Sequence, residues 1–323
     1  MRRRELIVFA AAWPVAARAQ SDATPVLGFL HSGAPEQNTE RINEYFGGLA
    51  QAGFTEGKNL KVEYRWAMGH SDRLPTLAAE LVQSGVTAIA TPGSTPAAIA
   101  AKKATSTIPI VFAIGADPVE VGLVASIGKP GGNATGVTSR NTELAAKRLG
   151  LIRELLPGAA HFAAIVNPTS QLAGPFTKDL DAGAATVGVK VEILKAATDA
   201  EIEAALTGVP KQPGNVVLFA SDSFFYIRRA KIAALAMQLR IPSIFDVPEY
   251  VAAGGLMSYG SDFSDVLHVA GRYTGRILKG ENPADLPVAQ SAKFTLAINL
   301  QTAKALGVTV PPRILALADQ VVE

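Results

Sequence analysis

Short apolar runs alternate with amphipathic segments along most of the chain. Several runs are almost continuously apolar and show no alternation of polar and apolar residues, which is typical of parallel strands covered on both faces. Four such runs are 86–91, 108–112, 162–166 and 216–220. Between the runs, apolar residues recur at helical spacing, as in Ile42, Tyr45, Phe46 and Leu49. Strands that alternate with helices predict an α/β fold with parallel sheets.

The same series of elements occurs twice. Strands predicted at 25–30 and 60–66 flank one helix, and strands at 161–166 and 189–194 flank another. The repeat predicts two similar α/β lobes, whereas one long doubly wound sheet is the alternative. The chain after Gly260 offers one long helix and a strand–helix tail, which is too little for a third domain. These last elements are therefore expected to join the two lobes.

The first nineteen residues are typical of a secretory signal peptide. Arg2, Arg3 and Arg4 precede an apolar stretch over 6–17, and Ala17-Arg18-Ala19 fits a cleavage site before Gln20. The apolar stretch is too short to span a bilayer, although a short N-terminal anchor is the alternative. The chain has no cysteine to carry a lipid. We expect an exported, unanchored periplasmic protein, with either the Sec or the twin-arginine route open.

Composition and charge narrow the possible functions. The 323 residues are 48% hydrophobic and carry a formal net charge of +2, which excludes a disordered chain. Residues 1–19 hold four arginines and one glutamate, so the remaining chain has 26 basic and 27 acidic side chains. Because no basic excess or stripe remains, we expect no nucleic-acid partner. The absence of cysteine excludes disulfides, thiolate metal sites and a cysteine nucleophile.

Catalytic motifs are scarce. The sequence has no metalloprotease HExxH, no nucleophile elbow, no Walker loop and no dinucleotide fingerprint. Its four histidines are scattered without metal-ligand spacing. We therefore expect no enzyme, no metal and no cofactor, and predict that the chain binds a small molecule.

Small polar residues gather where the predicted strands end, which is where ligands bind in open α/β sheets. Ser94 and Thr95 begin a helix whose N-terminus could hold a carboxylate, although either residue could be only an N-cap. Asp117 and Asp222 could each pair with a ligand ammonium or cap a helix, and His31 is either structural or a pocket residue. The predicted ligand-binding residues are Ser32, Gly93, Ser94, Thr95, Asp117, Asn167, Asp222, Tyr226 and Tyr259.

Several segments resemble the substrate-binding proteins of ABC importers, in the group that includes tryptophan and tyrosine receptors. The matching segments are Asp117-Pro118, Gly122-Leu123-Val124, Pro130-Gly131-Gly132-Asn133, Thr135-Gly136, 254–260, 283–287, Lys293-Phe294, 298–300 and 302–307. The resemblance implies a type I periplasmic-binding-protein fold, in which two Rossmann-like lobes with parallel sheets are joined by three crossings. The implied crossings lie near 134–140, 256–262 and 286–293.

The resemblance also divides the chain into lobes. Residues 20–136 with 262–285 form lobe 1, and residues 140–256 with 290–312 form lobe 2. It implies a periplasmic solute-binding protein that closes its lobes on an amino acid or a related, possibly aromatic, carboxylate. Helix N-termini would hold the carboxylate, Asp117 or Asp222 an amine, and Tyr226 or Tyr259 an apolar ring.

The expected partners are a small-molecule ligand and an ABC permease in the inner membrane. We expect a monomer, because closure needs no partner chain. Two alternatives stay open at this stage. One is a ligand-sensing module for a membrane receptor, and the other is a two-lobed α/β enzyme such as a transferase.

Overall fold

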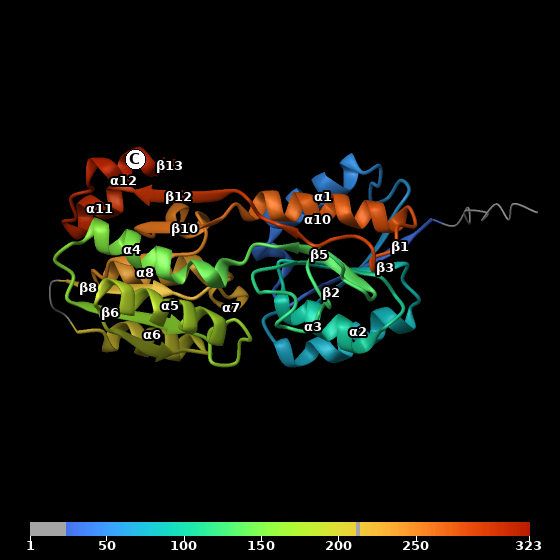
Figure 1. Ribbon diagram of the computed structural model, residues 1–323, viewed down its shortest axis with the longest axis horizontal. Coiled ribbons are helices and arrows are strands. Elements are labelled where there is room, and N and C mark those ends of the chain that lie inside the picture. Colours follow the sequence, from blue (N-terminus) through green and yellow to red (C-terminus); the bar gives the residue numbers. More distant parts are fainter. Residues whose placement is uncertain (1–23, 211–213) are drawn as a thin grey trace, which may run out of the picture.

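The computed structural model describes residues 24–210 and 214–323, and the predicted signal peptide over 1–19 lies outside them. Two α/β lobes lie side by side along the longest axis of the molecule (Figure 1). We call the lobe built on the first sheet lobe 1 and the other lobe 2. Within the described residues, no helix combines the length and the apolar character that a bilayer crossing requires.

Over the described residues, the sheet of lobe 1 has six strands in the order β11-β5-β4-β3-β1-β2, and every neighbouring pair is parallel. The strands are β1 Val26–His31, β2 Lys61–Trp66, β3 Ala88–Pro92, β4 Ile110–Ile114, β5 Ala134–Thr138 and β11 Ala289–Gln290. The order pairs β1 and β3 with a neighbour on each edge, and almost every residue of both strands is buried, as expected for parallel strands covered on both faces.

Over the same described residues, the sheet of lobe 2 has seven strands in the order β13-β12-β10-β9-β8-β6-β7. These are β6 His161–Val166, β7 Val191–Lys195, β8 Asn215–Phe219, β9 Ser243–Phe245, β10 Met257–Ser261, β12 Phe294–Asn299 and β13 Gln320–Val322. The predicted fold class, α/β with two lobes built on parallel sheets, is confirmed, and the strands of both sheets are mostly parallel.

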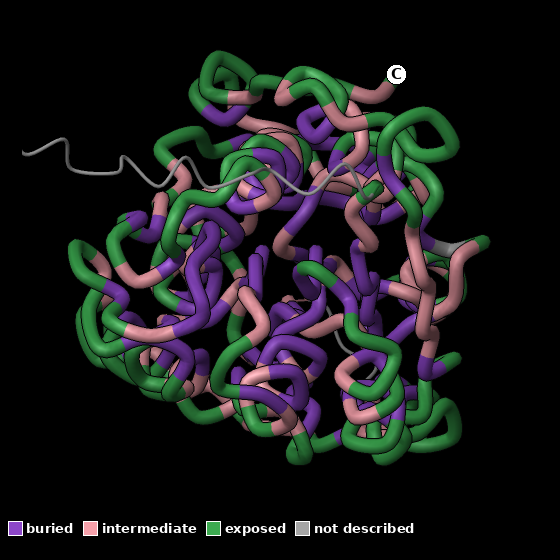
Figure 2. The backbone as a smooth tube through the Cα atoms, turned by 90° about the vertical axis from the view of Figure 1, so that its right-hand side faces the viewer, coloured by how far each residue is buried: buried purple, intermediate pink, exposed green. Residues whose placement is uncertain are grey.

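Helices cover both sheets, and the exposed positions lie on the outside of the molecule, on helices and on the connections between elements (Figure 2). In lobe 1 and at its border the helices are η1 Pro35–Gln37, α1 Thr39–Gln51, η2 Ser71–Arg73, α2 Leu74–Gln83, α3 Thr95–Ala104 and α10 Phe263–Leu278. In lobe 2 they are η3 Asn141–Leu144, α4 Ala145–Leu155, α5 Ala173–Val187, α6 Asp199–Gly208, α7 Ser223–Tyr226, α8 Arg229–Gln238, α9 Glu249–Ala252, α11 Leu300–Leu306 and α12 Pro312–Leu317.

Along the described chain, the backbone passes between the sheets three times. The first crossing joins β5 to η3, the second joins β10 to α10, and the third joins β11 to β12. All three lie along the upper side of the view in Figure 1, away from α2 and α6. The predicted crossing ranges fall at or beside these three connections.

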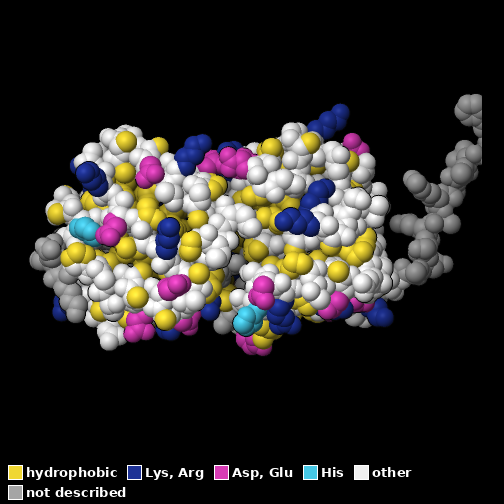
Figure 3. All heavy atoms as spheres, turned by 90° about the horizontal axis from the view of Figure 1, so that it is seen from below, with side chains coloured by type: hydrophobic (Ala, Val, Ile, Leu, Met, Phe, Trp, Pro, Cys, Tyr) yellow, Lys and Arg dark blue, Asp and Glu magenta, His cyan; other side chains and the backbone are white. Residues whose placement is uncertain are grey.

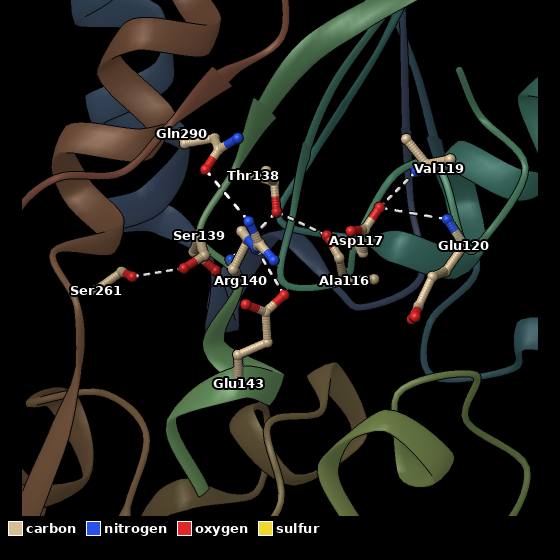
Figure 4. Close-up of polar contacts among 10 residues, drawn as sticks. All are labelled: Ala116, Asp117, Val119, Glu120, Thr138, Ser139, Arg140, Glu143, Ser261 and Gln290. Carbon is tan, nitrogen blue, oxygen red and sulfur yellow. Dashed lines mark hydrogen bonds and ion pairs between the residues drawn. The ribbon is translucent and has the colours of Figure 1, made fainter. Parts of the chain in front are cut away.

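The three crossings are tied to one another by hydrogen bonds. The Ser261 hydroxyl donates to the Ser139 carbonyl at 2.7 Å, which joins the second crossing to the first (Figure 4). The backbone N–H of Asp262 donates to the Lys293 carbonyl at 3.0 Å, which joins the second to the third. The N–H of Ser291 donates to the Thr138 carbonyl at 3.0 Å, which joins the third to the first. The connection between the lobes is therefore a bonded three-strand unit rather than three loose linkers.

Lobe 2 departs from the expected all-parallel sheet at one place, because β10 and β12 pair antiparallel. The chain leaves lobe 2 at the end of β10 and re-enters it at the start of β12 on the same edge, so the two strands must run in opposite directions. The sheet also continues to β13, ten residues beyond the lobe 2 boundary placed at 312. The remaining domain boundaries stay predictions.

Helices α1 and α10 approach unusually closely in lobe 1, and glycines make this possible. A Cβ on Gly271 would lie 2.1 Å from the Tyr45 carbonyl oxygen, and one on Gly48 would lie 1.9 Å from the His268 carbonyl oxygen. The hydroxyl of Tyr45 donates to Thr274 Oγ1 at 2.7 Å across the same contact. Since α10 follows the second crossing directly, this helix pair anchors the crossing to lobe 1.

We expect Gly271→Ala to destabilise the protein by about 3 kcal/mol, because the new methyl group meets backbone atoms that cannot rotate away. The matched control is Gly150→Ala in α4, where an added Cβ meets nothing within 4 Å. That change should be neutral or stabilise by up to about 1 kcal/mol, because alanine favours helix more than glycine does. Urea unfolding at pH 7 measures both. Equal midpoints for the two variants would contradict the close helix contact.

Candidate functional site

A cavity of about 570 Å³ lies between the two lobes. Its wall includes the residues that follow the carboxyl ends of strands from both sheets, such as Ser32, Gly93, Asn167 and Ser221. This volume lies in the range typical of small-molecule sites. Viewed from below, both lobes carry charged side chains of both signs (Figure 3). The predicted residues that line the cavity are Ser32, Gly93, Thr95, Asn167, Asp222 and Tyr226.

Ser94 lies behind the cavity wall rather than on it. Its hydroxyl oxygen accepts hydrogen bonds from the backbone N–H groups of Ala97 and Ser32, both at 3.3 Å, and donates to Ser32 Oγ at 3.0 Å. Ser94 is therefore the N-cap of α3 and also fixes the loop after β1. It leaves Thr95, the first residue of α3, to face the cavity.

Asp117 and Tyr259 also lie away from the cavity lining. The Asp117 carboxylate accepts the N–H groups of Val119 at 2.7 Å and Glu120 at 3.3 Å, which is the capping arrangement (Figure 4). The ring of Tyr259 stacks on Phe294 with centroids 6.2 Å apart, at the β10–β12 pair. The structure thus does not bring these two residues to the cavity with the others.

His31, at the end of β1, is buried with 3% of its surface exposed. Its Nδ1 accepts the backbone N–H of Gly33 at 2.8 Å, so the proton of the neutral ring is on Nε2. Burial, and then the Arg41 charge, lower the pKa of His31 to about 3. His31 is therefore a neutral structural group that shapes the loop carrying Ser32.

Asp222 lies at the end of the lobe 2 strand β8 and contributes to the cavity wall. Its Oδ1 accepts the Phe224 N–H at 2.6 Å, so the residue also caps α7. Burial raises the pKa of Asp222 above its ordinary value, and the Ser170 hydroxyl and the Asn167 amide partly oppose this rise. The groups that lower its pKa most are uncharged, so the carboxylate is held by neutral donors rather than by a paired cation.

Arg41 of α1 is a cavity residue that the sequence did not indicate. Its guanidinium lies 3.3 Å from the ring centroid of Tyr226 in lobe 2 and 4.6 Å from that of Phe263. It also pairs with Glu249 of lobe 2, with Nη2 at 3.3 Å from Oε1. A guanidinium over aromatic faces is favourable when it is partly desolvated. Arg41 therefore connects the two lobes at the cavity wall.

Asp246 follows β9 and is the second carboxylate on the lobe 2 wall. Burial raises its pKa, and the charge of Arg148 is the strongest opposing influence. Arg148 itself is fully buried in α4, where Nε donates to the Tyr259 carbonyl at 2.7 Å and Nη2 to the Asn141 carbonyl at 3.1 Å. The sequence could have indicated Asp246 as a site residue only by its position directly after a predicted strand.

Within the described part of the chain, five aspartate, lysine or arginine residues line the cavity, namely Arg41, Asp72, Lys103, Asp222 and Asp246. Among residues 24–210 and 214–323, Arg41 pairs with Glu249, the charge of Arg148 acts on Asp246, and Asp222 forms no ion pair. Across residues 24–210 and 214–323, no cluster of three His, Asp or Glu side chains is placed to hold a metal ion. The arrangement is suited to hold a small ligand that carries a positive charge toward lobe 2.

Comparisons with known proteins agree over nearly the whole chain. A family model described as ABC transporter substrate binding protein matches residues 38–322. The chain is also 30% identical over 259 residues to the tyrosine-binding protein of Clostridioides difficile. That alignment covers 80% of this chain and 74% of the relative.

Two solved structures are similar across both lobes. One is the ABC domain from Streptococcus pneumoniae in complex with L-Trp, which has a TM-score of 0.85 and 26% identity and covers 93% of this chain and 100% of its own. The other is a conserved domain protein from Vibrio cholerae, with a TM-score of 0.84, 28% identity and the same coverage. The two-lobed α/β fold is thus shared with proteins of known structure.

Proposed function

Because this chain belongs to the family of ABC transporter substrate-binding proteins, we propose that it captures an α-amino acid in the periplasm and delivers it to an ABC permease for import. The observation that carries the choice of ligand is Asp222, a cavity carboxylate that has no paired cation in the part of the chain that the structure describes. A ligand ammonium would supply the missing charge. The relatives named for tyrosine and L-Trp favour an aromatic amino acid.

The lining residues suggest how such a ligand would lie. The ammonium would sit at Asp222 on the lobe 2 wall, and the carboxylate would face Thr95 at the N-terminus of α3 in lobe 1. The lining side chains of Ile99, Leu172 and Ile227 would offer an apolar surface for the side chain of the ligand. The ligand would therefore contact both lobes at once.

Binding to both lobes would couple ligand capture to closure. The lobes already meet through Arg41 on Tyr226 and Glu249, and through the Ser32 and Ser223 hydroxyls at 3.3 Å. A ligand that bridges Thr95 and Asp222 adds contacts available only when the lobes are together, so it shifts the population toward the closed state. The bonded crossings would act as the hinge.

Calorimetric titration of the mature chain tests the ligand class. We expect L-tryptophan or L-tyrosine to bind, and indole-3-propionate, which lacks the ammonium, to bind at least about 100-fold more weakly, because Asp222 would then keep an unpaired charge. A matched control is tryptamine, which keeps the ammonium and lacks the carboxylate. Equal binding of indole-3-propionate and L-tryptophan would contradict the role of Asp222. Binding of sugars or polyols with no response to amino acids would contradict the proposal as a whole.

Closure can be followed on the same preparation, because the chain has no cysteine of its own. Dyes at Gln83→Cys in α2 and Glu203→Cys in α6 would report the distance between two exposed positions remote from the crossings (Figure 1). We expect the amino acid to shorten this distance. A control pair within lobe 1, Lys58→Cys and Gln83→Cys, should not change. Binding without any change in the first pair would show that capture does not require closure.

A further inference from the structure

One short segment of lobe 2 contacts lobe 1 beside the cavity. It comprises α7 and the residue after it, 223–227, and Figure 1 shows α7 at the border between the lobes. The Ser32 hydroxyl, after β1, donates to Ser223 Oγ at 3.3 Å. An added Cβ on Gly69, after β2, would lie 3.8 Å from Ile227 Cδ1. Two loops of lobe 1 therefore lie against these residues, which we call the α7 segment.

Arg41 of α1 joins lobe 1 to the α7 segment by two kinds of contact. Its guanidinium lies 3.3 Å from the ring centroid of Tyr226. Its Nε and Nη2 atoms donate to Oε1 of Glu249 in α9 at 3.4 and 3.3 Å, and the Tyr226 hydroxyl donates to the same oxygen at 3.4 Å. The side chains of Arg41 and Glu249 are only 13% and 22% exposed, so water and salt screen them weakly. Such a cluster holds more strongly than an ion pair on the open surface.

The three side chains are divided between the lobes. Arg41 belongs to lobe 1, whereas Tyr226 and Glu249 belong to lobe 2 and are hydrogen-bonded to each other. Separation of the lobes would remove Arg41 from both partners at once. Among the described residues Arg41 is the ion-pair partner of Glu249, so this carboxylate would lose its charge partner in the open state. The open state therefore carries a cost that does not depend on any ligand.

The α7 segment also connects this cluster to the ligand. Asp222, proposed above to hold the ammonium, caps α7 by accepting the Phe224 N–H at 2.6 Å, and its carbonyl accepts the Tyr226 N–H at 2.9 Å. The residue that would bind the ligand therefore also fixes the backbone that presents the Tyr226 ring to Arg41. Glu249, in contrast, does not line the cavity. The cluster can therefore be weakened at Glu249 without removing a group that touches the ligand.

We propose that Arg41, Tyr226 and Glu249 form a latch that holds the two lobes together before a ligand binds, and that the latch thereby sets the affinity for every ligand. The inference rests on the lobe closure in the proposed function and is independent of which amino acid is bound. Only the closed state offers both walls of the cavity, so the apparent dissociation constant varies inversely with the closed fraction of the unliganded protein. A weaker latch lowers that fraction and weakens the binding of all ligands by the same factor.

The test measures the distance between the lobes in the absence of any ligand. The mature chain with dyes at Gln83→Cys and Glu203→Cys is unfolded, dialysed and refolded, which removes any co-purified molecule. We expect the distance to be longer in Glu249→Gln, and longer still in Arg41→Met, than in the chain without these changes. Glu249→Gln removes the ion pair and keeps the contact of the guanidinium with the ring, whereas Arg41→Met removes both. Glu249→Gln added to Arg41→Met should give no further change, because the partner is already gone.

Titration with two ligands gives a second readout. Glu249→Gln should weaken the binding of L-tryptophan and of L-tyrosine by the same factor, about 3- to 30-fold, with faster dissociation in stopped-flow measurements. The ratio of the two affinities should stay as in the wild type, because Glu249 does not line the cavity. A residue that touched the ligand would change that ratio.

The matched control is Arg276→Met in α10. The Arg276 guanidinium lies 5.5 Å from the ring centroid of Tyr273, and its Nη2 lies 2.7 Å from Glu281 Oε2. These residues repeat the two kinds of contact of the latch, but all three belong to lobe 1 and its border. Arg276→Met should leave the distance between the lobes and both affinities as in the wild type.

Three outcomes would overturn the latch. An unchanged distance in both Glu249→Gln and Arg41→Met would show that these side chains do not hold the lobes together. An equal increase in Arg276→Met would show that the distance reports a general loosening of the fold. A ligand ratio altered by Glu249→Gln would show that Glu249 acts on the ligand rather than on closure. A failure of the proposed function would appear instead as no binding of either amino acid to the wild type, and the ligand-free distances would still decide the latch.

Discussion

Replacing Asp222 by Asn is expected to weaken amino-acid binding and to stabilise the unliganded protein at the same time. The ligand ammonium would lose its charged partner, which costs about 2–5 kcal/mol, or roughly 30-fold to several thousand-fold in affinity. The unliganded fold would lose a carboxylate that is held away from water without a cation, so its unfolding free energy should rise by on the order of 1 kcal/mol. Asn retains an oxygen that can cap Phe224 as Asp222 does.

The stabilisation should depend on pH in a direction that follows from the raised pKa of Asp222. A carboxyl whose pKa rises on folding holds its proton more tightly in the folded state. Wild-type stability therefore falls as pH rises from the ordinary value of 3.8 through the raised pKa. Asn does not titrate, so the advantage of Asp222→Asn is complete above that interval and disappears as pH falls toward about 4.

The matched control for this experiment is Asp117→Asn. Asp117 makes the same kind of cap, on Val119 and Glu120, but lies away from the cavity lining. Because Asn is also a good helix cap, Asp117→Asn should change neither ligand affinity nor unfolding free energy by a comparable amount. Thermal unfolding from pH 4 to pH 8 and titration with L-tryptophan measure both quantities. If Asp222→Asn binds as tightly as the wild type, the ammonium lies elsewhere in the cavity.

Asp117 and Asp222 also show why the candidate site could be predicted only in part. Each aspartate follows a strand and precedes a short helical turn, so the local sequence gives both the same two interpretations. Only the packing of the two lobes brings one of them to the cavity. Ser94 is a similar case, because its cap role was recognisable while its position behind the wall was not.

More of the fold than of the candidate site could be predicted from the sequence, because buried parallel strands give a strong local pattern of apolar residues. The apolar runs at 108–112 and 162–166 correspond to β4 and β6, and the repeat of elements corresponds to the two sheets. The antiparallel β10–β12 pair could not be read from the sequence, because strand direction follows from the path of the chain through the crossings. Arg41 gave no signal either, because its partners Tyr226 and Glu249 are far along the chain.

The side chain of Arg148 links the crossings to the cavity. It is fully buried, and its guanidinium holds carbonyls of Asn141 and Tyr259, which belong to the first crossing and to the strand before the second. It also supplies the charge that opposes Asp246. Replacement by methionine keeps most of the length of the side chain and removes all of its donors.

We expect Arg148→Met to destabilise the protein by about 3–5 kcal/mol, because two buried carbonyls lose a donor and Asp246 loses its cation. Arg153→Met in the same helix is the matched control. Arg153 is exposed and donates to the Val187 carbonyl at 2.9 Å, so its loss should cost less than about 1 kcal/mol. Urea unfolding at pH 7 gives the loss of unfolding free energy for both variants. Similar losses would contradict the role of Arg148 in holding the two carbonyls and the Asp246 charge.

The destabilisation by Arg148→Met has two parts, the loss of hydrogen bonds to two carbonyls and the loss of the charge near Asp246. The pH dependence of stability and a double variant separate them. Without Arg148, the pKa of Asp246 should rise further, so the deficit is largest above that pKa and shrinks as falling pH protonates the carboxyl. Asp246→Asn added to Arg148→Met should recover the charge-related part at pH 7 and leave the loss from the two carbonyls. If the double variant is as unstable as Arg148→Met alone, the carbonyls account for the whole effect. Arg148 would then act on the crossings rather than on the charge balance of the cavity.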